Sequence, residues 1–193
     1  MVLEADSGFR VLLVPGLHGS GEEHWQTRWE RRYPAFCRVE QKHWDRPDLA
    51  VWSDTMRQAL QQSTQPTLAV AHSFGCLTTL HCARLDVPNL VGALLVAPAD
   101  PVKFGVSDLL RAARPAFPSM LVGSLNDPWM TADRARHWAH LWGCSFVNAG
   151  ALGHINAESN LGEWSFGMML LRRLALRHIQ KHSKDMQKSS FSL

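Results

Sequence analysis

The chain has 193 residues, about the length of one domain, and its 46% of hydrophobic and 19% of charged residues are typical of a globular protein and exclude a disordered one. The net charge is +3, of which residues 172–193 hold +5, so residues 1–171 carry the remaining −2. A nucleic-acid-binding face needs basic residues spread over the fold, and we therefore expect no nucleic-acid partner.

Short apolar runs alternate with longer amphipathic segments along the chain, which is typical of an α/β protein with a mostly parallel sheet. The first run, "RVLLVPG", predicts a buried strand that ends in a Pro-Gly turn. Trp25 and Trp29 then share one face of a predicted helix, and "FCRVE" predicts a weaker strand. Asp48 is a candidate N-cap for a second helix, which carries Trp52 and Met56 on one stripe.

The same alternation continues through the second half of the chain. The expected strands are "PTLAVAH", "LVGALLVAP", "PSMLVGS" and "CSFVNAG", and the expected helices are "FGCLTTLHCARL", "TADRARHWAHLW" and "EWSFGMMLLRRLAL". We predict a three-layer α/β/α sandwich with about six mostly parallel strands. It forms one domain, residues 1–177, and we expect the polar, basic residues 178–193 to form a flexible tail. The irregular stretch from Asp100 to Ser119 is too short for a lid domain.

Ser73, in the segment "AVAHSFGCL", lies between a predicted strand and a predicted helix. A serine nucleophile can occupy such a turn when small residues flank it, usually as G-x-S-x-G, and here Ala71 and Gly75 stand at the two small positions. The alternative is an ordinary helix N-cap, for which serine is also favoured. The pentapeptide alone leaves both interpretations open.

A serine nucleophile needs a base to remove its proton and an acid to orient that base. In α/β enzymes with this turn, the acid and then the histidine follow the serine along the chain, each on a loop after a later strand. Asp127 and His154 meet that requirement, and Asp100 is a rival for the acid. His72 is a poor candidate base, because adjacent side chains on such a turn diverge.

Two backbone N–H groups are candidates for an oxyanion hole, those of Leu17 and Phe74. Leu17 lies in the glycine-rich segment "VPGLHGSG" after the first strand, which is otherwise a simple strand-to-helix turn. His137 and His140 share a predicted helix face, but no third ligand accompanies them, so we expect them on the surface and no metal site. We also expect no organic cofactor.

The chain's first residues and its cysteines bear on where the protein works. "MVLEADSGFR" lacks the apolar core of a secretory signal, and no run reaches the length of a membrane span, so we expect a cytoplasmic protein without a membrane partner. The cysteines have no CxxC spacing, and we expect them to be reduced thiols; they are Cys37, Cys76, Cys82 and Cys144.

Six blocks of the sequence, in order, resemble the small serine hydrolases of the α/β-hydrolase fold typified by retinoblastoma-binding protein 9 and bacterial YdeN-like proteins. They are "VPGLHGSGEEHWQTRWE", "HWDRPDLAVW", "VAHSFGCLTTLHCA", "VGALLVAPADP", "NDPW" and "ALGHINAESNLGEW", between about residues 10 and 174. The resemblance implies a lidless hydrolase with Ser73 as nucleophile, Asp127 as acid and His154 as base. The chain departs from the family pattern at Phe74, where leucine is common, and at Lys42 and His43, where the family often has an acidic pair.

These observations together predict an acyl hydrolase, most simply a carboxylesterase. The absence of a lid suggests an open cleft for small or short-chain esters, lined by Leu17, Phe74, Phe104 and Trp129. An amide could also be the substrate, because the same triad serves both bonds. A second class of function stays open, a scaffold that binds a protein partner and turns over slowly, since some of the eight tryptophans could form an exposed patch.

Overall fold

The computed structural model describes residues 8–190, without the side chains of residues 181–190. Within this range the strands form one six-stranded sheet in the order β2-β1-β3-β4-β5-β6, and every neighbouring pair is parallel. The strands are β1 (Arg10–Val14), β2 (Phe36–Arg38), β3 (Thr67–His72), β4 (Leu90–Val96), β5 (Ser119–Gly123) and β6 (Ser145–Asn148). The predicted α/β class and strand number are confirmed.

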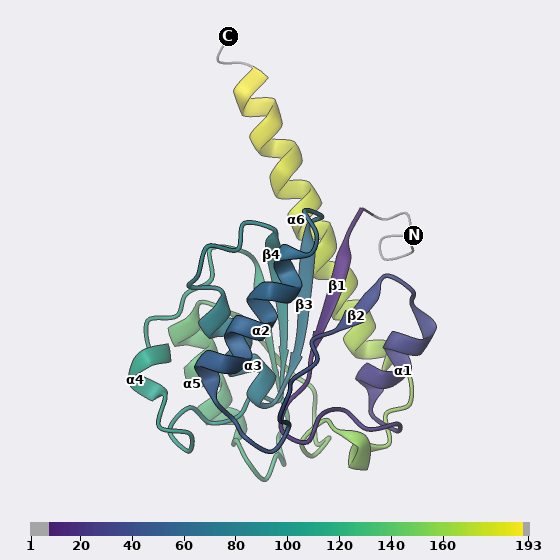
Figure 1. The fold of residues 1–193 in the computed structure, drawn as a ribbon, viewed down its shortest axis with the longest axis vertical. Helices are drawn as coiled ribbons and strands as arrows, with labels where there is room; N and C mark the ends of the chain where they lie inside the picture. The colour runs from purple at the N-terminus through teal and green to yellow at the C-terminus, as the bar shows by residue number, and fades with distance from the viewer. Residues whose placement is uncertain (1–7, 191–193) are drawn as a thin grey trace.

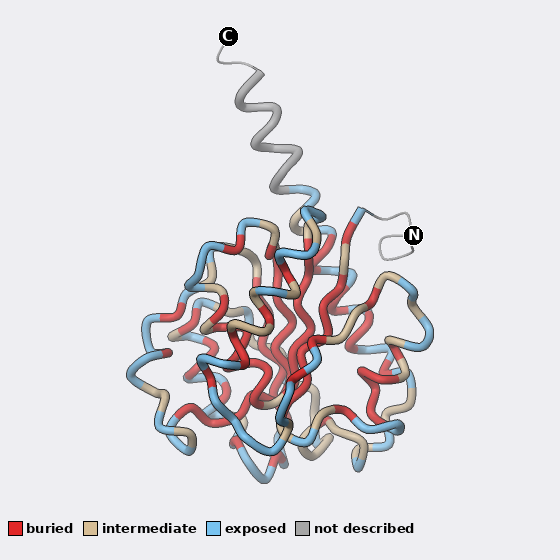
Figure 2. The backbone as a smooth tube through the Cα atoms, in the orientation of Figure 1, coloured by how far each residue is buried: buried red, intermediate tan, exposed pale blue. Residues whose placement is uncertain are grey.

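Helices cover both faces of the sheet (Figure 1). α1 (Trp25–Arg32) and α6 (Ser165–Ser190) pack on one face. The other face carries α2 (Leu49–Gln61), α3 (Phe74–Cys82), α4 (Ser107–Leu110) and α5 (Ala132–Trp142). Because both faces are covered, the central strands are buried along almost their whole length, as the red tube through the middle of Figure 2 shows.

The parallel arrangement decides where a site can form. All six strands point toward the lower end of the molecule in Figure 1, and α6 projects from the opposite end. The segments that follow β1, β3, β5 and β6 therefore meet at one edge, which is where open α/β sheets bind their ligands. The predicted nucleophile, acid and base all lie on these segments.

Most of the tryptophans belong to the core. Six are buried and Trp44 is half-buried, whereas Trp129 is 60% exposed. The buried ones are Trp25, Trp29, Trp52, Trp138, Trp142 and Trp164. An exposed tryptophan patch is therefore absent from the described residues, and the scaffold interpretation loses the sequence feature that supported it.

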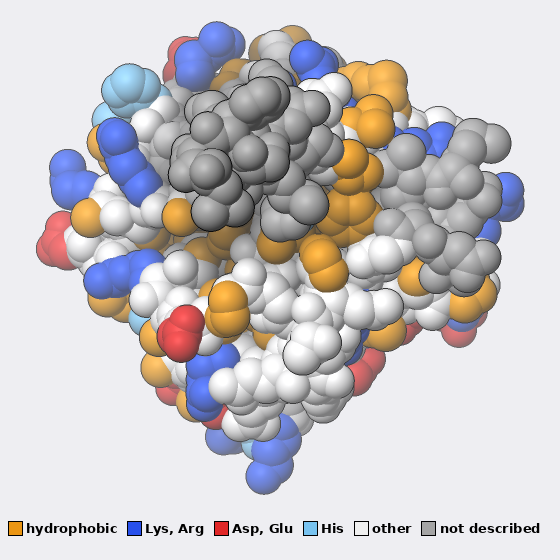
Figure 3. Space-filling view, turned by 90° about the horizontal axis from the view of Figure 1, so that it is seen from above, with side chains coloured by type: hydrophobic (Ala, Val, Ile, Leu, Met, Phe, Trp, Pro, Cys, Tyr) orange, Lys and Arg blue, Asp and Glu red, His pale blue; other side chains and the backbone are white. Residues whose placement is uncertain are grey.

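The C-terminal helix is longer than the sequence suggests. The pattern predicts a helix over residues 163–176, but the α6 backbone continues to Ser190, so no change of secondary structure marks the expected start of the tail at residue 178. The last three tail residues, 191–193, lie outside the described part. Figure 3 views the end from which α6 projects, where Lys and Arg side chains are scattered among other side chains and form no continuous patch in this view. Among residues 8–190, no helix is long and apolar enough to span a membrane.

Candidate active site

Ser73 lies on a strained turn between β3 and α3. Its backbone has φ 53° and ψ −120°, a positive φ that residues other than glycine rarely adopt. The side chain makes no capping hydrogen bond to α3, and it is half-buried. Ser73 therefore occupies the N-cap position of α3 without acting as a side-chain cap, and its hydroxyl lies at the carboxyl edge of the sheet.

Two glycines make this turn possible. A Cβ atom at Gly75 would lie 2.1 Å from the carbonyl oxygen of Val14, and one at Gly16 would lie 2.7 Å from Cβ of Ser73. Both distances are too short for any side chain. The segment after β1 thus packs directly against the turn that holds Ser73.

Asp127 and His154 come together on the segments after β5 and β6. Nδ1 of His154 lies 3.1 Å from Oδ1 and 2.9 Å from Oδ2 of Asp127, whose side chain is only 2% exposed. Because a carboxylate only accepts hydrogen bonds, Nδ1 carries a proton, which leaves Nε2 as the ring nitrogen that can act as a base. In the described part of the chain, the His154 ring makes no hydrogen bond to Ser73 Oγ. Hydrogen bonds between catalytic groups often tighten only in the complex with substrate.

Side chains next to Asp127 also hold the segment that carries His154. Oδ1 of Asn126 accepts hydrogen bonds from the Gly153 N–H at 2.7 Å and from the Ser124 hydroxyl at 3.0 Å. The Ser124 oxygen in turn accepts the Leu152 N–H at 2.9 Å. These bonds join the acid and histidine segments, and no motif in the sequence predicts them.

Asp100, the rival acid, has a different partner. Its carboxylate accepts two hydrogen bonds from the Arg134 guanidinium, at 2.5 and 3.0 Å, and its side chain is 7% exposed. The hydrogen bonds from Arg134 to Asp100 raise the pKa of that guanidinium. Asp100 therefore fastens its loop to α5 and does not contact His154.

The two predicted oxyanion donors lie beside Ser73. Phe74 is the first residue of α3, and its N–H has no acceptor within the helix. A Cβ at Gly16 would be 3.2 Å from the Phe74 nitrogen, which brings the Leu17 segment next to the same amide. Neither N–H donates to another group in the described part of the chain.

The predicted cleft-lining residues are not all at the surface. Trp129 is exposed, and Leu17 and Phe104 are half-buried, but Phe74 is fully buried. Its ring packs at 5.1 Å from that of Trp52 and 4.9 Å from that of Phe104. The expectation that the Phe74 ring lines the cleft is therefore wrong, because the first residue of α3 directs its side chain into the core between α2 and the sheet.

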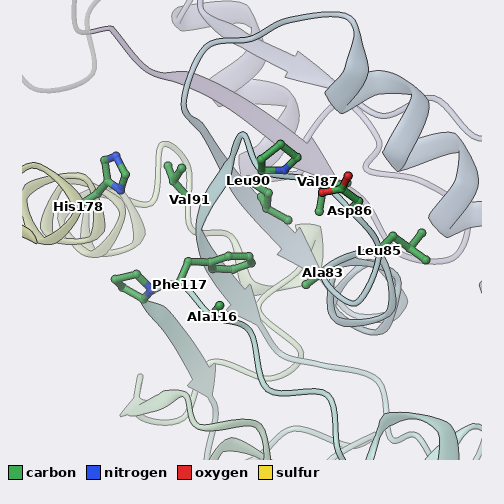
Figure 4. A pocket seen from close by; sticks show the side chains of 11 residues that line it. Ala83, Leu85, Asp86, Val87, Leu90, Val91, Ala116, Phe117 and His178 are labelled. Atoms are coloured by element: carbon green, nitrogen blue, oxygen red, sulfur yellow. The ribbon is translucent and has the colours of Figure 1, made fainter. Parts of the chain in front are cut away.

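A cavity in the described part of the chain lies apart from this site. This cavity, of about 450 Å³, opens at the amino ends of β4 and β5, between Leu90, Phe117 and His178 (Figure 4). It is at the opposite end of the strands from Ser73. No group of three or more His, Cys, Asp or Glu side chains that could hold a metal occurs among the described residues.

Comparisons with known proteins identify the family and the fold of the chain. A family model described as serine hydrolase matches residues 11–173. The structure of a YdeN-like hydrolase from Pectobacterium atrosepticum is 38% identical in sequence, with a TM-score of 0.84 over 88% of this chain and 92% of that one.

Other solved structures are similar at lower identity. The ydeN gene product of B. subtilis is 17% identical, with a TM-score of 0.64 over 83% of this chain and 96% of that one. Est1E from Butyrivibrio proteoclasticus is 10% identical, with a TM-score of 0.66 over 89% and 88% of the two chains. These two show the shared fold alone. The search of curated proteins found no match.

Proposed function

Because the chain belongs to the serine hydrolase family, we propose that it hydrolyses the carboxylic ester of a small or short-chain substrate, with Ser73 as nucleophile. His154 is the general base and Asp127 the acid that orients it. The observation that carries this proposal is the Asp127–His154 hydrogen bond at the sheet edge where Ser73 is held with a positive φ. The same groups can cleave an amide, which the substrate tests below distinguish from an ester.

In the first half of the reaction, Ser73 Oγ attacks the carbonyl carbon of the substrate while Nε2 of His154 takes the hydroxyl proton. The tetrahedral intermediate collapses when His154 passes this proton to the departing alcohol, which leaves an acyl group on Ser73. In the second half, His154 takes a proton from water, the hydroxide attacks the acyl carbon, and the proton returns to Ser73 as the carboxylic acid is released.

The negative charge of each intermediate is carried by the former carbonyl oxygen. We assign the N–H groups of Leu17 and Phe74 as its hydrogen-bond donors. Phe74 directly follows Ser73, Leu17 follows Gly16, which packs against Ser73, and neither N–H donates a hydrogen bond within the described residues. The start of α3 adds the favourable end of a helix dipole. Removing one such donor typically costs about 10²–10³ in rate.

We infer that the acyl group lies in an open site against Leu17, Phe104 and Trp129, of which Trp129 is exposed and the other two are half-buried. An open site holds a short acyl chain about as well as a long one, because additional carbons remain in water. We therefore expect kcat/KM for p-nitrophenyl esters not to rise as the acyl chain is lengthened. A clear preference for long acyl chains would contradict the open-cleft proposal.

A fluorophosphonate probe tests the nucleophile most directly. The wild type should be labelled and should hydrolyse p-nitrophenyl acetate, and Ser73→Ala should lose both activities. Ser53→Ala is the matched control, because Ser53 is a buried serine on α2 whose hydroxyl donates only to the backbone carbonyls of Leu49 and Thr78. Labelling that persists in Ser73→Ala, or none in the wild type, would refute the proposal and favour a binding scaffold.

A further inference from the structure

His72, the residue before the nucleophile, contacts the backbone of the catalytic histidine. Nε2 of His72 lies 2.9 Å from the carbonyl oxygen of His154, and the two rings lie 4.9 Å apart, edge to face. His72 is the last residue of β3 and is 6% exposed. We propose that His72 is a positioning residue that holds the main chain of His154, so that the ring of His154 stands between Asp127 and Ser73.

The hydrogen bond determines the protonation state of His72. A carbonyl oxygen only accepts, so Nε2 of His72 must carry a proton and donate it. Burial lowers the pKa of His72 well below its usual value, with the charges of His24 and His154 as smaller causes. His72 is thus a neutral donor whose Nε2 proton is engaged by the His154 carbonyl.

The segment that His72 holds has an unfavourable backbone conformation. Ile155, the next residue, is fully buried and has φ 49°, a region that β-branched residues rarely adopt. Such a conformation persists only where the surroundings impose it. The Ile155 carbonyl accepts a hydrogen bond from Nε1 of Trp25 at 2.8 Å, so two consecutive carbonyls are each fixed by a buried ring.

These contacts complement those of the acid. Asp127 fixes the ring of His154 through Nδ1, but a ring held at one atom can still swing with its main chain. His72 fixes that main chain at the His154 carbonyl. Without the donor, the His154 carbonyl loses its partner, and relaxation of Ile155 toward negative φ would move the His154 ring away from Ser73.

The proposal rests on the assignment of Ser73, Asp127 and His154, and it predicts a loss in kcat. His72→Leu removes the donor, and we expect kcat for p-nitrophenyl acetate to fall by about 10- to 100-fold with KM within about twofold, because misplacement of a catalytic group by about 1 Å costs this much. His72→Gln places a side-chain N–H where Nε2 lies, and we expect it to recover most of the lost kcat.

A spectroscopic measurement separates positioning from a general loss of structure. In protein labelled with ¹⁵N-histidine, the His154 Nδ1 proton bonded to Asp127 gives a strongly downfield resonance. We expect this resonance to broaden or move upfield in His72→Leu and to return in His72→Gln. Thr79→Val is the matched control, because Thr79 is a buried β-branched residue on α3 whose hydroxyl bonds only to the Gly75 carbonyl. We expect Thr79→Val to lower the free energy of unfolding. Its downfield resonance and its kcat should stay close to those of the wild type.

The outcomes distinguish failure of this inference from failure of the proposed function. If the wild type is not labelled by fluorophosphonate, the proposed function fails and this inference fails with it. If the wild type is active and folded His72→Leu keeps its kcat and its resonance, His72 is not a positioning residue. If His72→Leu does not fold, His72→Gln decides: wild-type kcat and resonance support the proposal, and a large loss of kcat with an unchanged resonance overturns it.

Discussion

Lowering the pH should destabilise the fold through His24, a second buried histidine. His24 is 4% exposed, and its Nδ1 accepts the Gln26 N–H at the start of α1. Burial, followed by the charges of Arg38 and His154, lowers the pKa of His24 from 6.5 to about 3. Between these values the unfolded chain binds a proton that the folded protein does not, so the free energy of unfolding falls as the pH falls.

The size of this effect follows from the two pKa values. At pH 5.0, which is 1.5 units below the unfolded pKa of 6.5, His24 alone should remove about 2 kcal/mol of stability relative to pH 7.5. The buried His72, with its pKa also lowered, acts in the same direction. The loss of stability begins as the pH falls below 6.5, where His24 of the unfolded chain becomes protonated. It ends as the pH approaches about 3, the pKa of His24 in the folded protein.

Urea unfolding followed by far-UV circular dichroism at pH 7.5 and pH 5.0 measures this loss. We expect His24→Asn, whose side-chain oxygen can still accept the Gln26 N–H, to lose about 2 kcal/mol less than the wild type between the two pH values. His140→Asn, a substitution at an exposed histidine of α5, is the control for loss of a histidine. A wild type and His24→Asn that lose equal stability, within about 0.5 kcal/mol, would refute the argument.

Two other pairs of variants test the site and its support. Asp127→Asn should lower kcat by about 10⁴-fold in the ester assay because the His154 ring loses its orienting acceptor, whereas Asp100→Asn should keep kcat and lower the free energy of unfolding by about 1 kcal/mol. If Asp100→Asn loses kcat and Asp127→Asn keeps it, Asp100 is the acid. Gly75→Ala should cost about 3 kcal/mol or more in urea unfolding, because its Cβ meets the Val14 carbonyl, whereas Gly21→Ala, with open space around it, should be tolerated. Equal stability of both would show that the turn is not tightly packed.

The features predicted well from the sequence are those with a local or topological cause. The alternation of apolar runs and amphipathic segments predicts the parallel sheet, because burial on both faces demands such strands. Parallel strands end at one edge, so the positions of Asp127 and His154 after later strands predict that they approach each other. Their hydrogen bond forms as that reasoning requires.

The features that the sequence does not reveal depend on packing between distant segments. Nothing near Phe74 indicates that its ring turns toward Trp52, and nothing near His72 indicates that it bonds to a carbonyl 82 residues away. The positive φ of Ile155 is equally hidden, since a β-branched residue predicts the opposite. Each of these is imposed by the assembled fold.

The bonds from Trp25 and His72 to the His154–Ile155 segment connect the first half of the chain to its last quarter. During synthesis, the proposed nucleophile Ser73 is therefore made long before the proposed base His154, and the two donors have no acceptors until β6 and its following loop have left the ribosome. Contacts so distant in sequence form late in folding. We therefore expect hydrolytic activity only after β6 has joined the sheet. A chain that ends before residue 154 can contain Ser73 and remain inactive.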